Sequence, residues 1–233
     1  MSAVPWAAVR PENATALAIL SRLDASLLDS AACFFAGGTA ISLRCGEHRV
    51  SRDLDFLCAS REGYRLLRQR VFAAGAAGLF AEGAIIVREP RVDRYGIRFI
   101  VAEQANAPPL KVEIVTEGRI DLVGTTDPAL PVQRIVDSDL VASKLLANAD
   151  RFFDEGSTSR DLIDLIVLEH AIGKLPDEAW RKARGAYGDS VDSAYERALD
   201  RLRDRTEERA RCFRVLDLSR DAQSIVEAKL AVR

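Results

Sequence analysis

Two aspartates, Asp53 and Asp55, are the residues of this chain best suited to chemistry. They stand two apart on a short apolar segment that predicts a strand over 53–58, and residues two apart on a strand point to the same face. Carboxylates held this close repel each other unless a cation lies between them. Magnesium is commonly held by one or two carboxylates together with substrate phosphates. The pair therefore predicts a site for a metal ion and a nucleotide.

A glycine-rich turn precedes the two aspartates in the sequence. Gly37 and Gly38 follow a short apolar run, predicted as a buried strand, and lead into a short predicted helix. Glycine lets the backbone approach a ligand closely, and the free amides at the start of a helix favour an anion. The turn therefore predicts phosphate binding, and the hydroxyl of Thr39 or Ser51 could add a phosphate contact or equally cap a helix. A tight turn without a ligand is the alternative for the glycines.

A third carboxylate, Glu113, stands within the apolar segment 110–115, which follows Pro108 and Pro109. An acid inside an apolar strand usually has a partner, because burying an unpaired charge is costly. The alternative is an edge-strand carboxylate that faces water. Three carboxylates from two strands can hold two metal ions, which activate an attacking hydroxyl and stabilise a leaving pyrophosphate.

A lysine in an apolar setting points to further binding residues. On one predicted helix Lys144, Asn148 and Arg151 share a face through steps of four and three, and Asp161 and Asp164 do the same on the next helix. A pair of helices joined by surface ion pairs would give this pattern too. The functional interpretation is a lysine and an arginine that bind a triphosphate and are oriented by the two aspartates.

Composition and net charge limit the class of protein that the chain can form. Of the 233 residues 48% are hydrophobic and 29% are charged, which is typical of a globular protein, and the net charge of −2 argues against a generally basic nucleic-acid-binding protein. A local basic patch of Arg44, His48, Arg49 and Arg52 is the predicted place for RNA phosphates, with a solvated loop as the alternative.

Targeting signals and metal-binding cysteine motifs are not apparent in the sequence. The four cysteines form no C-x-x-C pair, which disfavours zinc. The N-terminus has no signal-peptide pattern, and no apolar stretch approaches the roughly 18 residues of a membrane span. We therefore expect a cytoplasmic protein that makes no membrane contact.

The predicted fold is α+β. A mixed sheet flanked by helices is expected over residues 1–125 as the catalytic domain, and an all-helical domain that completes the nucleotide site is expected over 126–233. The expected strands lie at 31–36, 53–58, 84–87, 95–101 and 110–115. The expected helices lie at 13–28, 39–44, 62–74, 137–153, 159–171, 176–186, 190–214 and 221–231.

In chain order the motifs resemble those of the AbiEii/AbiGii-type nucleotidyltransferases, the toxins of type IV toxin–antitoxin systems in the DNA polymerase β-like superfamily. The motifs are G-G-T-A-x-x-L-R, R-x-S-x-D-L-D-F, V-E-I, A-S-K-L-x-A-x-x-x-R and R-D-L-x-D-L, and they span about residues 33–168. The resemblance implies a nucleotidyltransferase fold for the N-terminal part. The resemblance does not extend to the last sixty or so residues.

Residue roles follow from this resemblance. It implies that Gly37 and Gly38 hold the nucleotide phosphates and that Asp53 and Asp55 bind catalytic Mg²⁺, with Mn²⁺ as the alternative ion. Glu113 would take the third carboxylate position. Lys144 would contact the nucleotide, and the helical motif would be completed by Arg151, Asp161 and Asp164.

The resemblance also implies a reaction. The protein would move a nucleoside monophosphate from an NTP to an acceptor hydroxyl, with an RNA end, especially that of tRNA, as the favoured acceptor and a protein side chain as the other. A cognate antitoxin would be its partner. The alternative is a catalytically inactive module of the same fold that binds a nucleotide or a partner.

Overall fold

The computed structural model describes residues 10–154, 156 and 159–232. Their contacts divide the chain into two compact units. One unit comprises the chain up to Arg44 together with Ser51–Val136, and the other comprises Cys45–Val50 together with the chain from Asp137 onward. The segment 45–50 therefore packs with the C-terminal helices, although helix α3 of the first unit precedes it and strand β2 of the same unit follows it.

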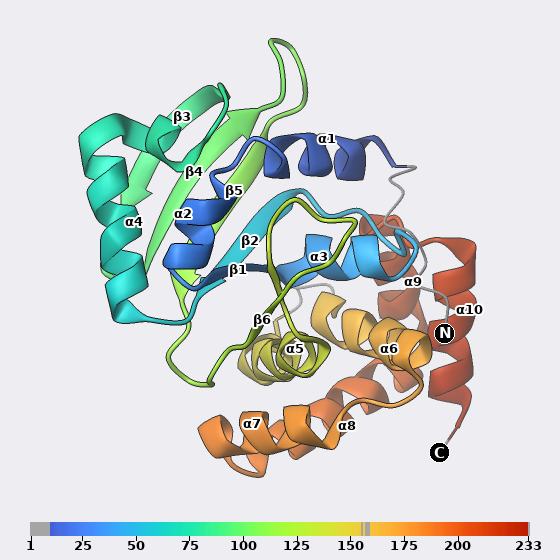
Figure 1. Cartoon of the computed structure of the whole chain (residues 1–233). Coiled ribbons are helices and arrows are strands. Elements are labelled where there is room, and N and C mark those ends of the chain that lie inside the picture. The colour runs from blue at the N-terminus through green and yellow to red at the C-terminus, as the bar shows by residue number, and fades with distance from the viewer. Residues whose placement is uncertain (1–9, 155, 157–158, 233) are drawn as a thin grey trace. The chain divides into compact units, whose positions relative to one another are not determined.

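A mixed sheet forms the centre of the first unit (Figure 1). Seven strands are present in the described residues, in the order β3-β4-β5-β2-β1-β7-β6. They are β1 (Cys33–Ala36), β2 (Asp53–Cys58), β3 (Ile85–Val92), β4 (Gly96–Ala102), β5 (Leu110–Thr116), β6 (Gly124–Thr125) and β7 (Arg134–Ile135). The predicted domain boundary at 125/126 falls between β6 and β7, two strands too short to show a periodic pattern.

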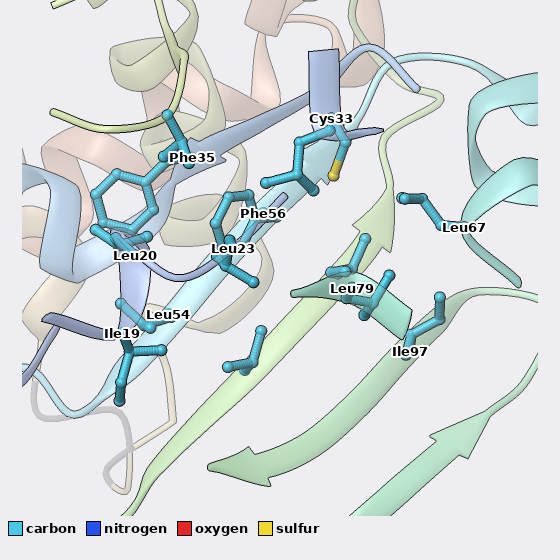
Figure 2. Packing of buried hydrophobic residues seen from close by; sticks show 14 of the residues in the cluster. Ile19, Leu20, Leu23, Cys33, Phe35, Leu54, Phe56, Leu67, Leu79 and Ile97 are labelled. Atoms are coloured by element: carbon cyan, nitrogen blue, oxygen red, sulfur yellow. The ribbon is translucent and has the colours of Figure 1, made fainter. Parts of the chain in front are cut away.

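Strand β2 lies inside the sheet and is paired on both edges. It runs antiparallel to β1 and parallel to β5. Leu54 and Phe56 are 0% and 1% exposed, whereas the alternate residues Asp53 and Asp55 are partly exposed. Figure 2 shows Leu54 and Phe56 packed among apolar side chains of the same core, including that of Phe35 on β1. The alternation predicted for this strand is therefore confirmed.

In the part of the first unit that the structure describes, four α-helices and a 3₁₀ helix accompany the sheet. They are α1 (Pro11–Leu20), α2 (Ala25–Ser30), α3 (Gly37–Arg44), α4 (Arg61–Ala74) and the 3₁₀ helix η1 (Gly75–Leu79). The prediction of a single helix over 13–28 is wrong, because the first helix ends at Leu20 and a second begins at Ala25. The Asp24 carboxylate accepts a hydrogen bond from the Leu27 amide at 2.9 Å and starts α2 as a separate helix.

Six helices form the second unit within the described residues. They are α5 (Asp137–Arg151), α6 (Arg160–Ile172), α7 (Asp177–Tyr187), α8 (Ser190–Asp204), α9 (Thr206–Val215) and α10 (Arg220–Ala231). Helix α5 packs against α6, α7 and α8. The helix predicted over 190–214 is two helices, because Arg205 adopts a non-helical conformation with φ −103° and ψ 76°.

Backbone hydrogen bonds join the segment 45–50 to the helices of its unit. The Val50 amide donates to the Leu216 carbonyl at 3.0 Å, and the Ser219 amide donates to the His48 carbonyl at 2.8 Å. These bonds hold the segment at the turn between α9 and α10.

The α+β fold with a helical C-terminal region is confirmed. Cys33, Cys58 and Cys212 are buried, as is usual for free cysteines used as small apolar residues. Among the helices that the structure describes, none combines the length and the apolar character needed to cross a membrane.

Gly63 makes a close contact that we expect to control the stability of the first unit. A Cβ atom at Gly63 on α4 would lie 1.9 Å from the carbonyl oxygen of Ala31, so a side chain here forces the backbones apart. We expect Gly63→Ala to lower the free energy of unfolding by about 3 kcal/mol in urea titrations followed by circular dichroism.

Gly185 on α7 provides the matched control, because nothing lies within 4 Å of a Cβ atom built there. Alanine favours a helix over glycine, so Gly185→Ala should raise the free energy of unfolding by about 1 kcal/mol. Equal stability of Gly63→Ala and the wild type would contradict the close contact.

Candidate functional site

The predicted carboxylates of the first unit share one face of the sheet. In the parallel register of β2 and β5, Asp55 lies opposite Glu113 and Asp53 lies opposite Lys111. Since side chains alternate along both strands, all four side chains emerge on the face opposite to Leu54 and Phe56. The structure therefore brings together the three acids that the sequence singles out in this unit.

Gly37 lies directly against the Asp55 carboxylate. Its φ of +75° belongs to the left-handed region that favours glycine, and a Cβ atom built on it would lie 2.2 Å from Asp55 Oδ2. Thr39 is 1% exposed and donates its hydroxyl hydrogen to the Asp53 carbonyl. The start of α3 is thus attached to β2 at the two aspartates, and Thr39 serves this attachment. Ser51 is partly exposed just before β2.

Glu113 is engaged by two cations in this structure. Arg98 Nε donates to Glu113 Oε1 at 2.6 Å, and Lys111 Nζ donates to Oε2. Partial burial raises the pKa of Glu113, but the hydrogen bonds from Lys111 and Arg98 outweigh burial and hold the pKa below its usual value. Glu113 is therefore an ionised carboxylate whose oxygens are already hydrogen-bonded.

Asp53 and Asp55 have the donor chemistry that a hard divalent cation needs. They are paired carboxylates on one face, with the glycine backbone of Gly37 packed against one of them. Among the described residues, no group of three or more histidine, cysteine, aspartate or glutamate side chains is arranged to hold a metal ion. Two carboxylates together with substrate phosphates are a common magnesium set, so the donor chemistry fits the ion.

The predicted helical residues of the second unit meet around one buried carboxylate. Asp164 on α6 is 0% exposed and accepts two hydrogen bonds from the Arg49 guanidinium, at 2.7 and 2.8 Å. His48 Nε2 lies 2.9 Å from Asp164, and Lys144 Nζ lies 2.8 Å from it. Because an ionised carboxylate only accepts, the Nε2 atom carries the proton in this contact.

Asp161 extends this group, which we call the Asp164 cluster (His48, Arg49, Lys144, Arg151, Asp161 and Asp164). Lys144 Nζ donates to Asp161 at 3.0 Å, and Arg151 binds the same carboxylate with two hydrogen bonds, at 2.6 and 2.9 Å. The predicted grouping of Lys144 and Arg151 with the aspartates is therefore present, with the ion pairs of Lys144 buried and that of Arg151 partly buried.

Charge pairing sets the protonation states in the Asp164 cluster. Burial raises the pKa of Asp164, but Arg49 and Lys144 outweigh it and hold that pKa well below its usual value. For Lys144 burial acts to lower the pKa, and attraction to Asp164 and Asp161 reverses this and raises it. Burial lowers the pKa of His48 more than Asp164 raises it, so the imidazole is neutral near pH 7.

The prediction of an RNA patch is wrong for His48 and Arg49, and it stays a prediction for Arg44 and Arg52. His48 and Arg49 are 1% and 4% exposed because they compensate the buried charge of Asp164. Lys144, predicted to contact the nucleotide, is 6% exposed and has its ammonium on two carboxylates.

Sequence reasoning missed several partners of the predicted residues. The charged segment 45–50 looks like a solvated loop, and nothing in it indicates pairing with a residue more than a hundred positions away. Lys111 could have been found, because it stands two residues before Glu113 on one strand and period-two alternation puts both on one face. The pairing of Arg98 with Glu113 could not have been found from the sequence, because it depends on the register of β4 against β5.

A comparison with known families decides what kind of protein this is. The family described as "Nucleotidyl transferase AbiEii toxin, Type IV TA system" matches residues 18–228, nearly all of the chain. The chain belongs to this family. The protein is thus a nucleotidyltransferase of the type IV toxin–antitoxin class, with a nucleoside triphosphate as substrate and an antitoxin as partner. No curated protein matches the chain.

Solved structures give a likeness of fold. An antigenic nucleotidyltransferase-like protein from Paracoccidioides brasiliensis superposes with a TM-score of 0.50 at 14% identity, over 84% of this chain and 91% of that one. A putative nucleotidyltransferase from H. pylori superposes with a TM-score of 0.37 at 14% identity, over 80% of this chain and 94% of that one. The first supports the nucleotidyltransferase-like fold, and the second is too distant to carry an argument.

The neutral, buried His48 makes stability depend on pH. Its pKa is lower in the folded protein than in the unfolded chain, so the unfolded chain binds more protons and stability falls as the pH drops below about 6.5. We expect His48→Gln to remove most of this fall between about pH 7 and pH 5. Urea unfolding at several pH values measures the effect.

The exposed His170 is the other histidine of the chain, and His170→Gln is the matched control. This control should keep the pH dependence of the wild type. An unchanged pH dependence in His48→Gln would show that His48 is not the group that takes up the proton.

Proposed function

We propose that the protein transfers a nucleoside monophosphate from an NTP to an acceptor hydroxyl in a Mg²⁺-dependent reaction. The oxygen of the acceptor forms a bond to the α-phosphorus, the bond between the α-phosphorus and the bridging oxygen breaks, pyrophosphate leaves, and the hydroxyl proton passes to water. The observation that carries the proposal is the pair Asp53 and Asp55 on one face of β2, with Gly37 packed against Asp55.

Each group of the first unit has a proposed role. Asp53 and Asp55 would hold Mg²⁺, which lowers the pKa of an attacking hydroxyl and neutralises charge on the phosphates. The backbone of Gly37 and Gly38 at the start of α3 would bind phosphate oxygens, since amides at a helix start favour anions. Ser51 remains a proposed phosphate contact.

Whether Glu113 can act as a third metal ligand depends on the two basic side chains that bind it. Arg98 and Lys111 occupy both of its oxygens, so ligation would require at least one of them to leave. With both in place, Glu113 instead positions two positive charges on the carboxylate face beside Asp55, where they would attract the phosphates of a substrate.

In the second unit we keep Lys144 and Arg151 as proposed nucleotide contacts, with Asp161 and Asp164 as the acids that orient them. The Arg151 side chain is 38% exposed and is therefore the more accessible of the two cations. That the helical domain completes the nucleotide site stays a prediction. Asp164 also binds Arg49 in the segment between α3 and β2, so its removal would affect a segment joined to both elements of the carboxylate site.

An RNA end, such as the acceptor end of tRNA, is the proposed acceptor. This rests on the family resemblance and on no contact in the structure, so the acceptor assay must include protein as well as RNA.

Loss of either aspartate should abolish transfer. We expect Asp53→Asn and Asp55→Asn each to reduce the incorporation of α-labelled nucleotide into total RNA by at least about a hundredfold, because an amide cannot hold the metal and its charge. Asp29→Asn is the control, since Asp29 is an exposed acid on α2, and it should keep wild-type activity.

Full activity in both aspartate variants would contradict the assignment of the site. If the wild type binds NTP but labels neither RNA nor protein, the chain acts as an inactive nucleotide-binding module and the proposed reaction is wrong.

The contact between Gly37 and Asp55 gives a second test of the site. We expect Gly37→Ala to reduce transfer strongly, because the added methyl would displace the Asp55 carboxylate. Gly46→Ala is the matched control: Gly46 also has a positive φ, of +64°, but nothing lies within 4 Å of its Cβ position. The two variants share the backbone strain, so equal activity in both would show that the contact with Asp55 does not matter.

A further inference from the structure

A groove of about 770 Å³ lies in the first unit at the end of β2 remote from the two aspartates. It begins at Cys58, the last residue of β2. Three segments line it, namely the start of α4, the turn between β3 and β4, and the loop that follows β5. Among its described lining residues, none is proposed to act in nucleotidyl transfer. The groove therefore needs an explanation of its own.

Three arginines line the α4 side of this groove. Arg61, Arg65 and Arg68 follow one another at steps of four and three, so they share a face of the helix and are spread over about 10 Å of its axis. Arg61 and Arg65 are exposed. No ion pair joins any of the three to a carboxylate of the described residues, and the buried Nε of Arg68 has no hydrogen-bond partner there. Three cations without acidic partners indicate an anionic ligand.

The turn between β3 and β4 adds a cation and an exposed ring. The Arg94 guanidinium lies 4.3 Å from the centre of the Tyr95 ring, and Tyr95 is 56% exposed. The guanidinium lies over one face of the ring, and the exposed area that remains is a stacking surface for another flat group.

This turn is held firmly by its neighbours. The Asp93 carboxylate accepts hydrogen bonds from the Tyr95 and Gly96 amides at 2.7 and 2.9 Å, and the buried Tyr64 of α4 donates its hydroxyl hydrogen to the Asp93 carbonyl at 2.6 Å. The Thr116 amide donates to the Tyr95 carbonyl at 3.1 Å. The ring is thus presented by a preorganised backbone, which lowers the entropy cost of binding.

The acids of the groove do not cancel its positive charge. Glu117 accepts hydrogen bonds from the Arg119 guanidinium at 3.0 and 2.7 Å. Burial raises the pKa of Glu117, but Arg119 outweighs burial and lowers it, so this acid is ionised and already paired. The lining then presents four arginines against one further acid, Asp121.

We propose that this groove binds a single-stranded segment of nucleic acid, with its phosphates on Arg61, Arg65 and Arg68 and a base stacked on Tyr95. Charged grooves that follow a phosphate backbone, combined with aromatic rings for the bases, are the usual means of binding single strands. An acidic peptide would satisfy the arginines but leave the exposed ring without a flat partner. Binding here needs neither NTP nor metal, so the inference stands apart from the proposed reaction.

Fluorescence anisotropy with a labelled single-stranded RNA of mixed sequence, without NTP or Mg²⁺, tests this proposal. We expect Arg61→Gln/Arg65→Gln to weaken binding about tenfold and to reduce the slope of log affinity against log salt by about 1.4, the share of two phosphate contacts. Arg70→Gln/Arg88→Gln is the matched control, because both arginines are exposed in the same unit and lie outside the groove. It should bind as the wild type does.

Variants of Tyr95 distinguish the contribution of base stacking to RNA binding from the contribution of charge. Tyr95→Ala should weaken binding about tenfold, and Tyr95→Phe should restore it, because the ring and not the hydroxyl supports a base. Asp29→Asn, at an exposed acid outside the groove, should bind RNA as the wild type does, and because binding is measured without NTP and Mg²⁺, a failure of the transfer reaction leaves this test intact.

Two outcomes would overturn the proposal. One is equal weakening by the groove and control arginine pairs, which would indicate unspecific attraction. The other is that poly-glutamate competes as well as unlabelled RNA and that Tyr95→Ala has no effect, which would make the groove a site for an acidic protein segment.

Discussion

Pairing of β2 on both of its edges is the constraint on which the carboxylate site depends. With β1 on one side and β5 on the other, the strand can neither slide nor rotate without losing the burial of Leu54 and Phe56. The alternation that buries these two residues brings Asp53 and Asp55 out on the opposite face. A shift of register by one residue would bury two carboxylates and expose two core residues, so the energetics of the core fix the geometry of the chemistry.

The second unit depends on a different kind of interaction, a buried carboxylate surrounded by cations. The ionised carboxylate of Asp164 is tolerated in the core only because Arg49 and Lys144 compensate its charge, and removal of Arg49, Lys144 or Asp164 would leave buried charges unpaired. Arg49 belongs to the segment between α3 and β2, which continues directly into the two elements that carry Gly37 and Asp53. Arg49 therefore links the Asp164 cluster, through the covalent chain, to the end of α3 and to the start of β2.

The sequence predicted those parts of the fold that rest on local patterns. The alternation of apolar and polar residues along β2 and β5 identified both strands and placed Asp53 and Asp55 on a common face. Helical spacing placed Lys144 and Arg151 on one face of a helix. The break between α1 and α2 was missed, because the capping of α2 by Asp24 interrupts an apolar pattern that continues through both helices.

Long-range pairing could not be predicted from these patterns. The contact of His48 and Arg49 with Asp164 joins residues more than a hundred positions apart, and the contact of Arg98 with Glu113 depends on how two strands align. The charge pattern alone predicted a surface patch of Arg44, His48, Arg49 and Arg52. A charged residue is exposed or buried according to whether a partner reaches it, and the partner is a property of the fold.

The central claim is that the Asp53 and Asp55 face binds the metal ion and the nucleotide phosphates. The most direct measurement is a crystal structure with Mn²⁺ and a non-hydrolysable NTP, in which anomalous scattering locates the ion. We expect Mn²⁺ in contact with carboxylate oxygens of Asp53 and Asp55, about 2 Å away, and phosphate oxygens at the Gly37-Gly38 turn. An ion and a nucleotide bound elsewhere in the molecule, with both aspartates unligated, would contradict it.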